Sequence, residues 1–216
     1  MPGWIGWGLR RAGWTSRRGP GCRGLRRVSE VEARGGLVGS RVPVEIVGLL
    51  VSPVHAFEGR PQDGPRVDPL DGVVDRVIVR AGLGLVGDRY FNQAVHRKAA
   101  VTVFAVESLE TLADELGIAV PDPQLVRRNV VLRGFPVDEL AARRLADGSR
   151  VEGRVFSLDS GLGAVRFQAH RPANPCAWMD VAVAPGAFKG LRGHGGVRCE
   201  PLDDGELRLG PALLTL

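Results

Sequence analysis

From Pro43 to the end of the chain, hydrophobic residues come in short segments that Gly, Pro and Asp interrupt. This pattern is typical of β-strands joined by tight turns. Residues 150–158 and 163–170 alternate between apolar and polar positions and are separated by four residues, which predicts a hairpin. The segments expected to be strands are 44–51, 73–79, 100–104, 129–134, 150–158, 163–170, 195–202, 206–210 and 212–216.

One segment has a clear helical period. Its apolar residues recur at spacings of three and four, and Gly117 stands where a left-handed residue would end the helix. The pattern predicts a helix over residues 105–117 and a short helical passage over 137–145. The apolar positions of the main helix are Val106, Leu109, Leu112, Ala113 and Leu116.

The order of these elements defines the fold class. Strands do not alternate regularly with helices, and residues 52–72 form a proline-rich loop of the kind that frames a site. We therefore expect a mostly β, α+β domain with a barrel-like sheet, one main helix and a few short ones.

Charge separates the first forty residues from the rest. They contain eight Arg against Glu30 and Glu32, a net charge of +6, whereas the whole chain carries +5. The remaining residues therefore carry a net charge of −1. Residues 1–40 also hold ten Gly and little aliphatic surface, so we expect residues 1–41 to be a disordered leader and residues 42–216 to be the folded domain.

Composition also restricts the partners. Every apolar run is shorter than the ~18–20 residues of a membrane-spanning helix, so no membrane insertion is expected. A basic leader with three Trp has the composition of a nucleic-acid or polyanion binding module, which is the alternative function from another class. We consider nucleic acid the weaker partner because the domain itself is nearly neutral. Three cysteines do not form a disulfide framework, which favours reduced thiols and a cytoplasmic location.

The segment GLGLVGDRY (82–90) has the glycines of a phosphate loop but lacks the Gly-Lys-Ser/Thr that such loops need. A second interpretation places Gly87 at positive φ in a tight turn. Asp88 would then bond neighbouring backbone amides, and Arg89 would remain free to meet an anion. A purely structural turn fits the same residues.

The segment HRPANPCAWMD (170–180) carries the strongest chemical signal. Pro172 and Pro175 stiffen the approach to Cys176, which holds its thiol in place. Positive charge from Arg171 and His170 favours the thiolate, the form that attacks as a nucleophile or binds a soft metal. A small buried hydrophobe is the alternative for any free cysteine, and we expect it for Cys199 within its alternating strand.

Two other sites use the same residues. A zinc site would need His170, Cys176, His194 and Cys199, an order without the usual ligand spacing. His55 and His96 lie in separate polar segments and are not expected to bind metal. A Cys/His nucleophilic pair of Cys176 with His194 or His96 remains open, as would suit a cofactor-free thiol hydrolase.

The motifs together, in their order, resemble the MOSC domain, named for the C-terminal domain of molybdenum cofactor sulfurase. The resemblance runs from about Ile46 to Leu209. The matching segments are GLVGDRY (84–90), AVTVFAVESLETL (100–112), RRNVVLRG (127–134), RPANPCAWMD (171–180), GHGGVRC (193–199) and DGELRLG (204–210). The family pattern is broken at Gly210-Pro211 and Gly148-Ser149, where Gly-Asp is usual.

The resemblance implies a β-barrel of the pyruvate-kinase-barrel-like type that binds the molybdenum cofactor, molybdopterin. Cys176 matches the family cysteine proposed to carry sulfur or to ligate molybdenum, so it is both the expected catalytic residue and the expected metal ligand. The residues implied to bind the cofactor are Asp88, Arg89, Arg128, Asn129 and Arg171.

The implied function is that of a stand-alone family member. Such proteins look like sulfur or cofactor carriers, or like oxidoreductases that reduce N-hydroxylated compounds, including hydroxylated purines. The expected partners are a small-molecule substrate or cofactor and, for a reductase, a redox partner protein.

Overall fold

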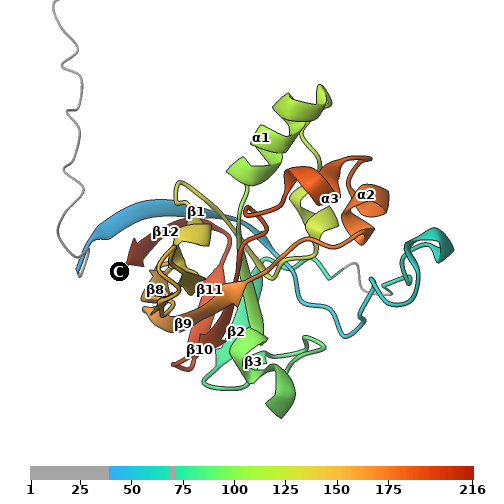
Figure 1. Ribbon diagram of the computed structural model, residues 1–216. Helices are drawn as coiled ribbons and strands as arrows, with labels where there is room; N and C mark the ends of the chain where they lie inside the picture. The colour runs from blue at the N-terminus through green and yellow to red at the C-terminus, as the bar shows by residue number, and fades with distance from the viewer. Residues whose placement is uncertain (1–38, 69–71) are drawn as a thin grey trace, which may run out of the picture. The chain divides into compact units, whose positions relative to one another are not determined.

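The computed structural model describes residues 39–68 and 72–216, and their strands close into a barrel (Figure 1). The barrel strands are β1 (Arg41–Leu49), β4 (Val101–Ala105), β5 (Val130–Arg133), β8 (Val155–Asp159), β9 (Val165–Pro172), β10 (Val197–Pro201) and β12 (Gly210–Thr215). Their order around the barrel is β1-β12-β8-β9-β10-β4-β5, and β5 pairs with β1 to close it. Within it, β4 and β5 pair in parallel and the other neighbours are antiparallel.

Two smaller sheets accompany the barrel. The first has the order β11-β2-β3, and the second is a two-stranded hairpin of β6 and β7. Their bounds are β2 (Arg76–Arg80), β3 (Gly84–Leu85), β11 (Gly205–Arg208), β6 (Arg143–Arg144) and β7 (Arg150–Val151).

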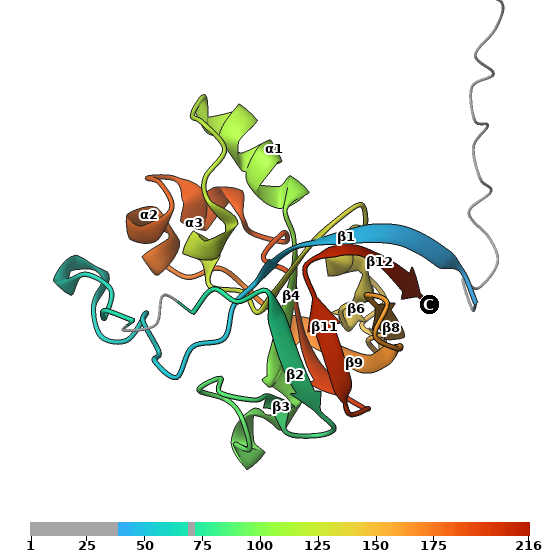
Figure 2. The ribbon, with the colours of Figure 1, turned by 180° about the vertical axis from the view of Figure 1, so that it is seen from behind.

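The α-helices of the described residues lie together on one side of the barrel, as Figures 1 and 2 both show. They are α1 (Glu107–Leu116), α2 (Trp178–Ala182) and α3 (Ala187–Gly190). Short 3₁₀ helices cover Pro61–Asp63, Ala94–Ala99, Pro123–Val126 and Val137–Leu140. Helix α1 lies in the crossover between β4 and β5, which parallel strands require.

The hydrophobic core has two parts that share β4. Val101, Val103 and Ala105 of this strand face the barrel interior, whereas Phe104 packs into the helical cluster with Leu109 of α1. Every residue of β4 is buried, which explains why its sequence is apolar without alternation. The barrel therefore gives a rigid wall on which the helices and their connecting loops are held.

The structure confirms the fold expected from the sequence, a mostly β barrel with one main helix. Helix α1 occupies the predicted segment, and Gly117 ends it in the left-handed conformation at φ 64°. The predicted hairpin is formed by β8 and β9. None of the described helices is long and apolar enough to cross a membrane.

Two local expectations were wrong. Only Val137–Leu140 of the passage 137–145 is helical, and Arg143–Arg144 belongs to β6. The segment 150–158 is divided between β7 and β8, and between these strands the Arg154 amide donates to the Leu140 carbonyl at 2.9 Å. The prediction of a disordered leader concerns residues that lie mainly outside the described range, which begins at Gly39; strand β1 begins at Arg41.

Candidate functional site

Cys176 lies in the loop between β9 and α2, and its side chain is exposed. Arg128 anchors this loop: its Nη2 donates to the Ala173 carbonyl at 2.8 Å and its Nε donates to the Gly195 carbonyl at 3.0 Å. The Ala173 amide donates to the Gly196 carbonyl at 2.7 Å. The cysteine loop and the GHGG segment are thus fastened to each other and to Arg128.

The two glycines of that segment allow this close packing. A Cβ on Gly195 would lie 2.3 Å from the Ala173 oxygen, and one on Gly196 would lie 2.3 Å from the Val103 oxygen. Gly196 also has a φ of +87°, which side-chain-bearing residues rarely adopt. Gly195 is therefore required by the contact of this segment with the cysteine loop, and Gly196 by its contact with β4.

Cys176 opens onto a cavity of about 150 Å³ that is rich in arginine. The lining residues are His55, Ala56, Phe57, Arg89, Tyr90, Thr102, Val126, Arg127, Arg128, Asn174, Cys176, Met179 and Arg198. Burial, reinforced by the charge of Arg198, lowers the pKa of Arg128 to about 10, so Arg128 remains cationic at neutral pH. Burial followed by the charge of Arg171 lowers the pKa of Arg198.

Arg89 is the least satisfied of these cations. Its side chain is only 16% exposed, and its Nε and Nη1 groups are buried without a hydrogen-bond acceptor. The guanidinium lies over the Tyr90 ring, with Nη1 3.7 Å from Asp88 Oδ2. Gly87 has the predicted positive φ, +90°, and the turn directs Arg89 into the cavity. Buried donors without acceptors are costly, which makes this a place prepared for an anion.

Asp88 and Asn129 lie behind the cavity rather than among the residues that line it. The Asp88 carboxylate is fully buried and accepts bonds from the Tyr90 amide and from Asn129 Nδ2, both at 3.0 Å. Asn129 also accepts from the Thr102 amide at 2.9 Å and donates to the Leu50 carbonyl at 3.1 Å. These two residues fix the turn that carries Arg89.

The loop after β1 supplies residues that the sequence analysis did not assign to the site. His55 and Phe57 line the cavity, and Phe57 stacks on Trp178 with ring centroids 5.5 Å apart. Burial, followed by the charge of Arg89, lowers the pKa of His55, which favours its neutral form. No local pattern in the proline-rich loop marks His55.

Arg127 fastens the same loop from the opposite wall. Its Nη2 donates to Ser52 Oγ at 2.8 Å and to Asp68 Oδ2 at 2.7 Å. The residue has a φ of 51°, which is uncommon for a side chain larger than glycine and lets the guanidinium reach both partners. Arg127 Nη2 is thus bonded to two protein groups, whereas its Nε, like Nε and Nη1 of Arg89, is buried without a hydrogen-bond partner.

Arg171 is not brought to the Cys176 cavity. It lines a separate hollow with β6 and β7, and the neighbouring His170 has its Nε2 3.5 Å from Glu200 Oε2. His96 packs against Tyr90 with ring centroids 4.4 Å apart, and neither it nor His194 lines the cavity. The structure therefore does not bring together the Cys/His pairs considered from the sequence. Among the described residues, no group of three or more His, Cys, Asp or Glu is arranged to hold a metal ion.

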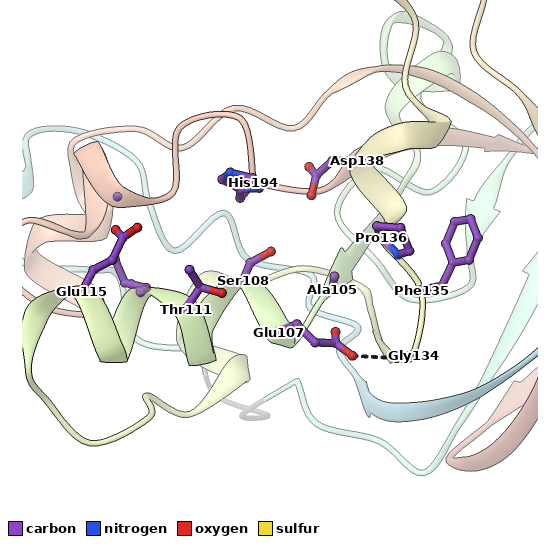
Figure 3. A pocket seen from close by; sticks show the side chains of 12 residues that line it. Ala105, Glu107, Ser108, Thr111, Glu115, Gly134, Phe135, Pro136, Asp138 and His194 are labelled. Carbon is purple, nitrogen blue, oxygen red and sulfur yellow. Dashed lines mark hydrogen bonds between the residues drawn. The ribbon is translucent and has the colours of Figure 1, made fainter. Parts of the chain in front are cut away.

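A larger cavity of about 360 Å³ lies beside α1 (Figure 3). Glu107, Glu115 and Asp138 give it an acidic lining, and His194 lies on its far wall. The Glu107 carboxylate accepts the Gly134 amide at 2.7 Å, and Asp138 accepts the Gly196 amide at 2.8 Å. Burial raises the pKa of Asp138. This cavity differs from the arginine-rich one in charge, and no cysteine lines it.

Comparison with known families identifies the class of protein. The MOSC domain model matches residues 87–213, more than half of the chain, so the chain belongs to the MOSC domain family. The domain is associated with the molybdenum cofactor. A comparison with curated proteins finds no match.

Solved structures resemble the fold. The YuaD protein from Bacillus subtilis superposes with a TM-score of 0.58 at 15% identity, covering 82% of this chain and 97% of that chain. YiiM from Geobacillus stearothermophilus superposes with a TM-score of 0.49 at 17% identity, covering 80% of this chain and 75% of that chain. At such identities the likeness to YuaD supports the barrel fold alone.

Proposed function

We propose that this protein binds the molybdenum cofactor at the Cys176 cavity and uses it through Cys176. The observation that carries the proposal is the pairing of an exposed thiol with Arg89, whose buried Nε and Nη1 lack acceptors, in one cavity. A soft thiolate suits molybdenum, and an arginine fork suits the phosphate of the pterin. The family, which is associated with this cofactor, supports the same assignment.

The residues present fit the two ends of the cofactor. Arg89, Arg128 and Arg198 surround the cavity with positive charge, and Cys176 stands on its outer side. A volume of about 150 Å³ is below the range of sites that enclose a whole drug-sized ligand. We therefore expect the charged end to be enclosed and the remainder to lie at the mouth.

Each residue has a separate role in this proposal. Cys176 supplies the sulfur, Arg89 and Arg198 hold the anion, and Arg128 keeps the cysteine loop fastened. Asp88 and Asn129 position Arg89 from behind. Burial and the charge of Arg89 lower the pKa of His55 and favour its neutral form. We assign to it the exchange of a proton within the cavity.

The finer activity we propose is reduction of N-hydroxylated compounds, with transfer of cofactor or sulfur as the other use of the same site. When bound, the cofactor supplies two-electron redox chemistry. The reduction converts an N–OH group, two electrons and two protons into N–H and water, so an external reductant is required. His55 is the residue we assign to the proton supply.

The test uses the full chain purified from a host that makes the cofactor. Molybdenum and pterin should copurify in comparable amounts with the protein, and the molybdenum should be missing after growth without molybdate. Reduced viologen dye should then drive conversion of a hydroxylaminopurine to the aminopurine. If the cofactor copurified but the hydroxylaminopurine were not converted, the protein would be a carrier of cofactor or sulfur and not a reductase. Absence of both molybdenum and pterin would refute the proposed function.

A further inference from the structure

The β6–β7 hairpin forms a second basic site away from Cys176. A hollow of about 300 Å³ lies between this hairpin and the end of β9. Its lining residues are Ala142, Arg143, Arg144, Arg150, Val151, Glu152 and Arg171. The Ala142 amide donates to the His170 carbonyl at 2.6 Å, which fastens the hairpin beside Arg171. Four arginines and one acidic residue, Glu152, therefore line one hollow.

The four arginines of the hollow are not neutralised by acidic side chains of the described residues. Within residues 39–68 and 72–216, none of the four makes an ion pair or a side-chain hydrogen bond. Other exposed arginines do pair with acids. Those pairs are Arg76 with Glu206, Arg80 with Asp204, Arg97 with Glu200, Arg133 with Glu110 and Arg166 with Asp203.

The register of the β6–β7 hairpin places like charges directly opposite each other. Arg144 stands opposite Arg150 across the two strands, and like charges at such positions destabilise a sheet. Arg171 adds a further charge from β9. A two-residue strand pair has few contacts to offset this repulsion, so an anion bound between Arg144 and Arg150 would stabilise the hairpin.

We propose that this hollow is a binding site for a small molecule that carries a diphosphate. Its volume is at the lower end of small-molecule sites, which favours a compact ligand over a protein surface. The planar fork of arginine matches phosphate oxygens in pairs, and a diphosphate offers enough negative charge for several forks. The proposal stands whether or not Cys176 binds the molybdenum cofactor.

Calorimetric titration of the full chain with ADP and with inorganic pyrophosphate tests the site. Both should bind with one-to-one stoichiometry. Arg143→Gln with Arg144→Gln should weaken binding of each by at least ~10-fold, because charge-assisted hydrogen bonds to the phosphates are lost. The matched control is Arg76→Gln with Arg80→Gln, which removes the same charge from β2. That control should change affinity less than ~3-fold, as expected for long-range charge screened by salt.

Three outcomes would overturn the proposal. They are an absence of binding, equal weakening by the control pair, and binding of citrate as tight as that of pyrophosphate. Loss of binding in Arg89→Gln together with retention in the hairpin variant would also overturn it, because the anion would then sit at the Cys176 cavity.

The diphosphate has two possible sources that the same variants distinguish. It belongs either to a free nucleotide or to the nucleotide end of a longer ligand whose other end lies against Cys176. Mass spectrometry of small molecules released from purified protein separates them. A nucleotide lost from both Cys176→Ser and the variant Arg143→Gln with Arg144→Gln identifies the longer ligand. A nucleotide lost from the hairpin variant alone identifies the free ligand.

Discussion

The side-chain amide of Asn129 donates to the buried carboxylate of Asp88 across 3.0 Å, joining two motifs that lie 41 residues apart. The bond ties the turn before Arg89 to the start of β5. The orientation of Arg89 therefore depends on a residue that does not line its cavity.

The first prediction concerns the stability of this link. Asn129→Ala leaves the Asp88 carboxylate with one donor fewer and the Thr102 amide without its acceptor. We expect the free energy of unfolding to fall by about 2–4 kcal/mol, measured by urea denaturation. Asn174→Ala, which truncates an exposed asparagine at the cavity, should change it by less than about 0.5 kcal/mol. If the two variants lowered the free energy of unfolding equally, the hydrogen bonds of Asn129 would not stabilise the fold.

The second prediction concerns the glycine contact beneath the cysteine loop. Gly196→Ala combines a strained φ with a Cβ 2.3 Å from the Val103 oxygen, so it should cost at least ~3 kcal/mol of unfolding free energy. Gly163→Ala has a similar φ, +97°, with no atom within 4 Å, and should cost about 1–2 kcal/mol. Thermal unfolding of both variants checks the difference. Equal losses of stability in the two variants would show that the Val103 oxygen does not exclude a Cβ at position 196.

The third prediction is the titration of His55. Its pKa is lowered by burial and then by Arg89, so NMR should place the midpoint below the ordinary value of 6.5. Arg89→Gln should move the midpoint upward, and Arg127→Gln should move it less because the charge of Arg127 acts on this histidine more weakly than that of Arg89. If Arg89→Gln left the midpoint unchanged, the charge of Arg89 would not act on His55.

The sign of the pH effect on stability follows from the same shift. A lowered pKa in the folded state means that the unfolded chain binds the proton more readily. His55 therefore contributes stability above pH 6.5, and that stability is lost as the pH falls through 6.5 toward the folded midpoint. The difference in thermal midpoint between the parent and His55→Gln should shift in favour of the variant from pH 7.5 to 5.5. If the difference in thermal midpoint were the same at pH 7.5 and pH 5.5, the lowered pKa of His55 would be contradicted.

The sequence was sufficient for the parts of the site that local chemistry determines. Gly87 needs a positive φ for its turn, and the period of α1 ends at a glycine, so both could be predicted from a few neighbouring residues. Cys199 was expected to be packed, and it is fully buried in β10. The order of the motifs was enough to predict the barrel.

What the sequence did not predict depends on long-range geometry. Ala169 of β9 pairs with Cys199 of β10, and Pro172 pairs with Val197. The two pairs are therefore three residues apart along β9 but only two apart along β10. This bulge gives β9 an extra residue between Ala169 and Pro172, the stretch that carries Arg171, and the sequence pattern does not mark it. His55 comes from a loop whose course depends on the Phe57–Trp178 stack and the Arg127–Asp68 ion pair.

Molybdenum content of the cysteine variants tests the central claim most directly. Both variants are purified from a host that makes the cofactor, and metal is measured per folded chain. Cys176→Ser should fold normally because its side chain is exposed, yet should lose molybdenum at least ~10-fold. Cys199→Ser buries a hydroxyl in a barrel strand, so it should unfold about 1–3 kcal/mol more easily while keeping the metal. Molybdenum retained at the parent level in Cys176→Ser would contradict ligation by this thiolate.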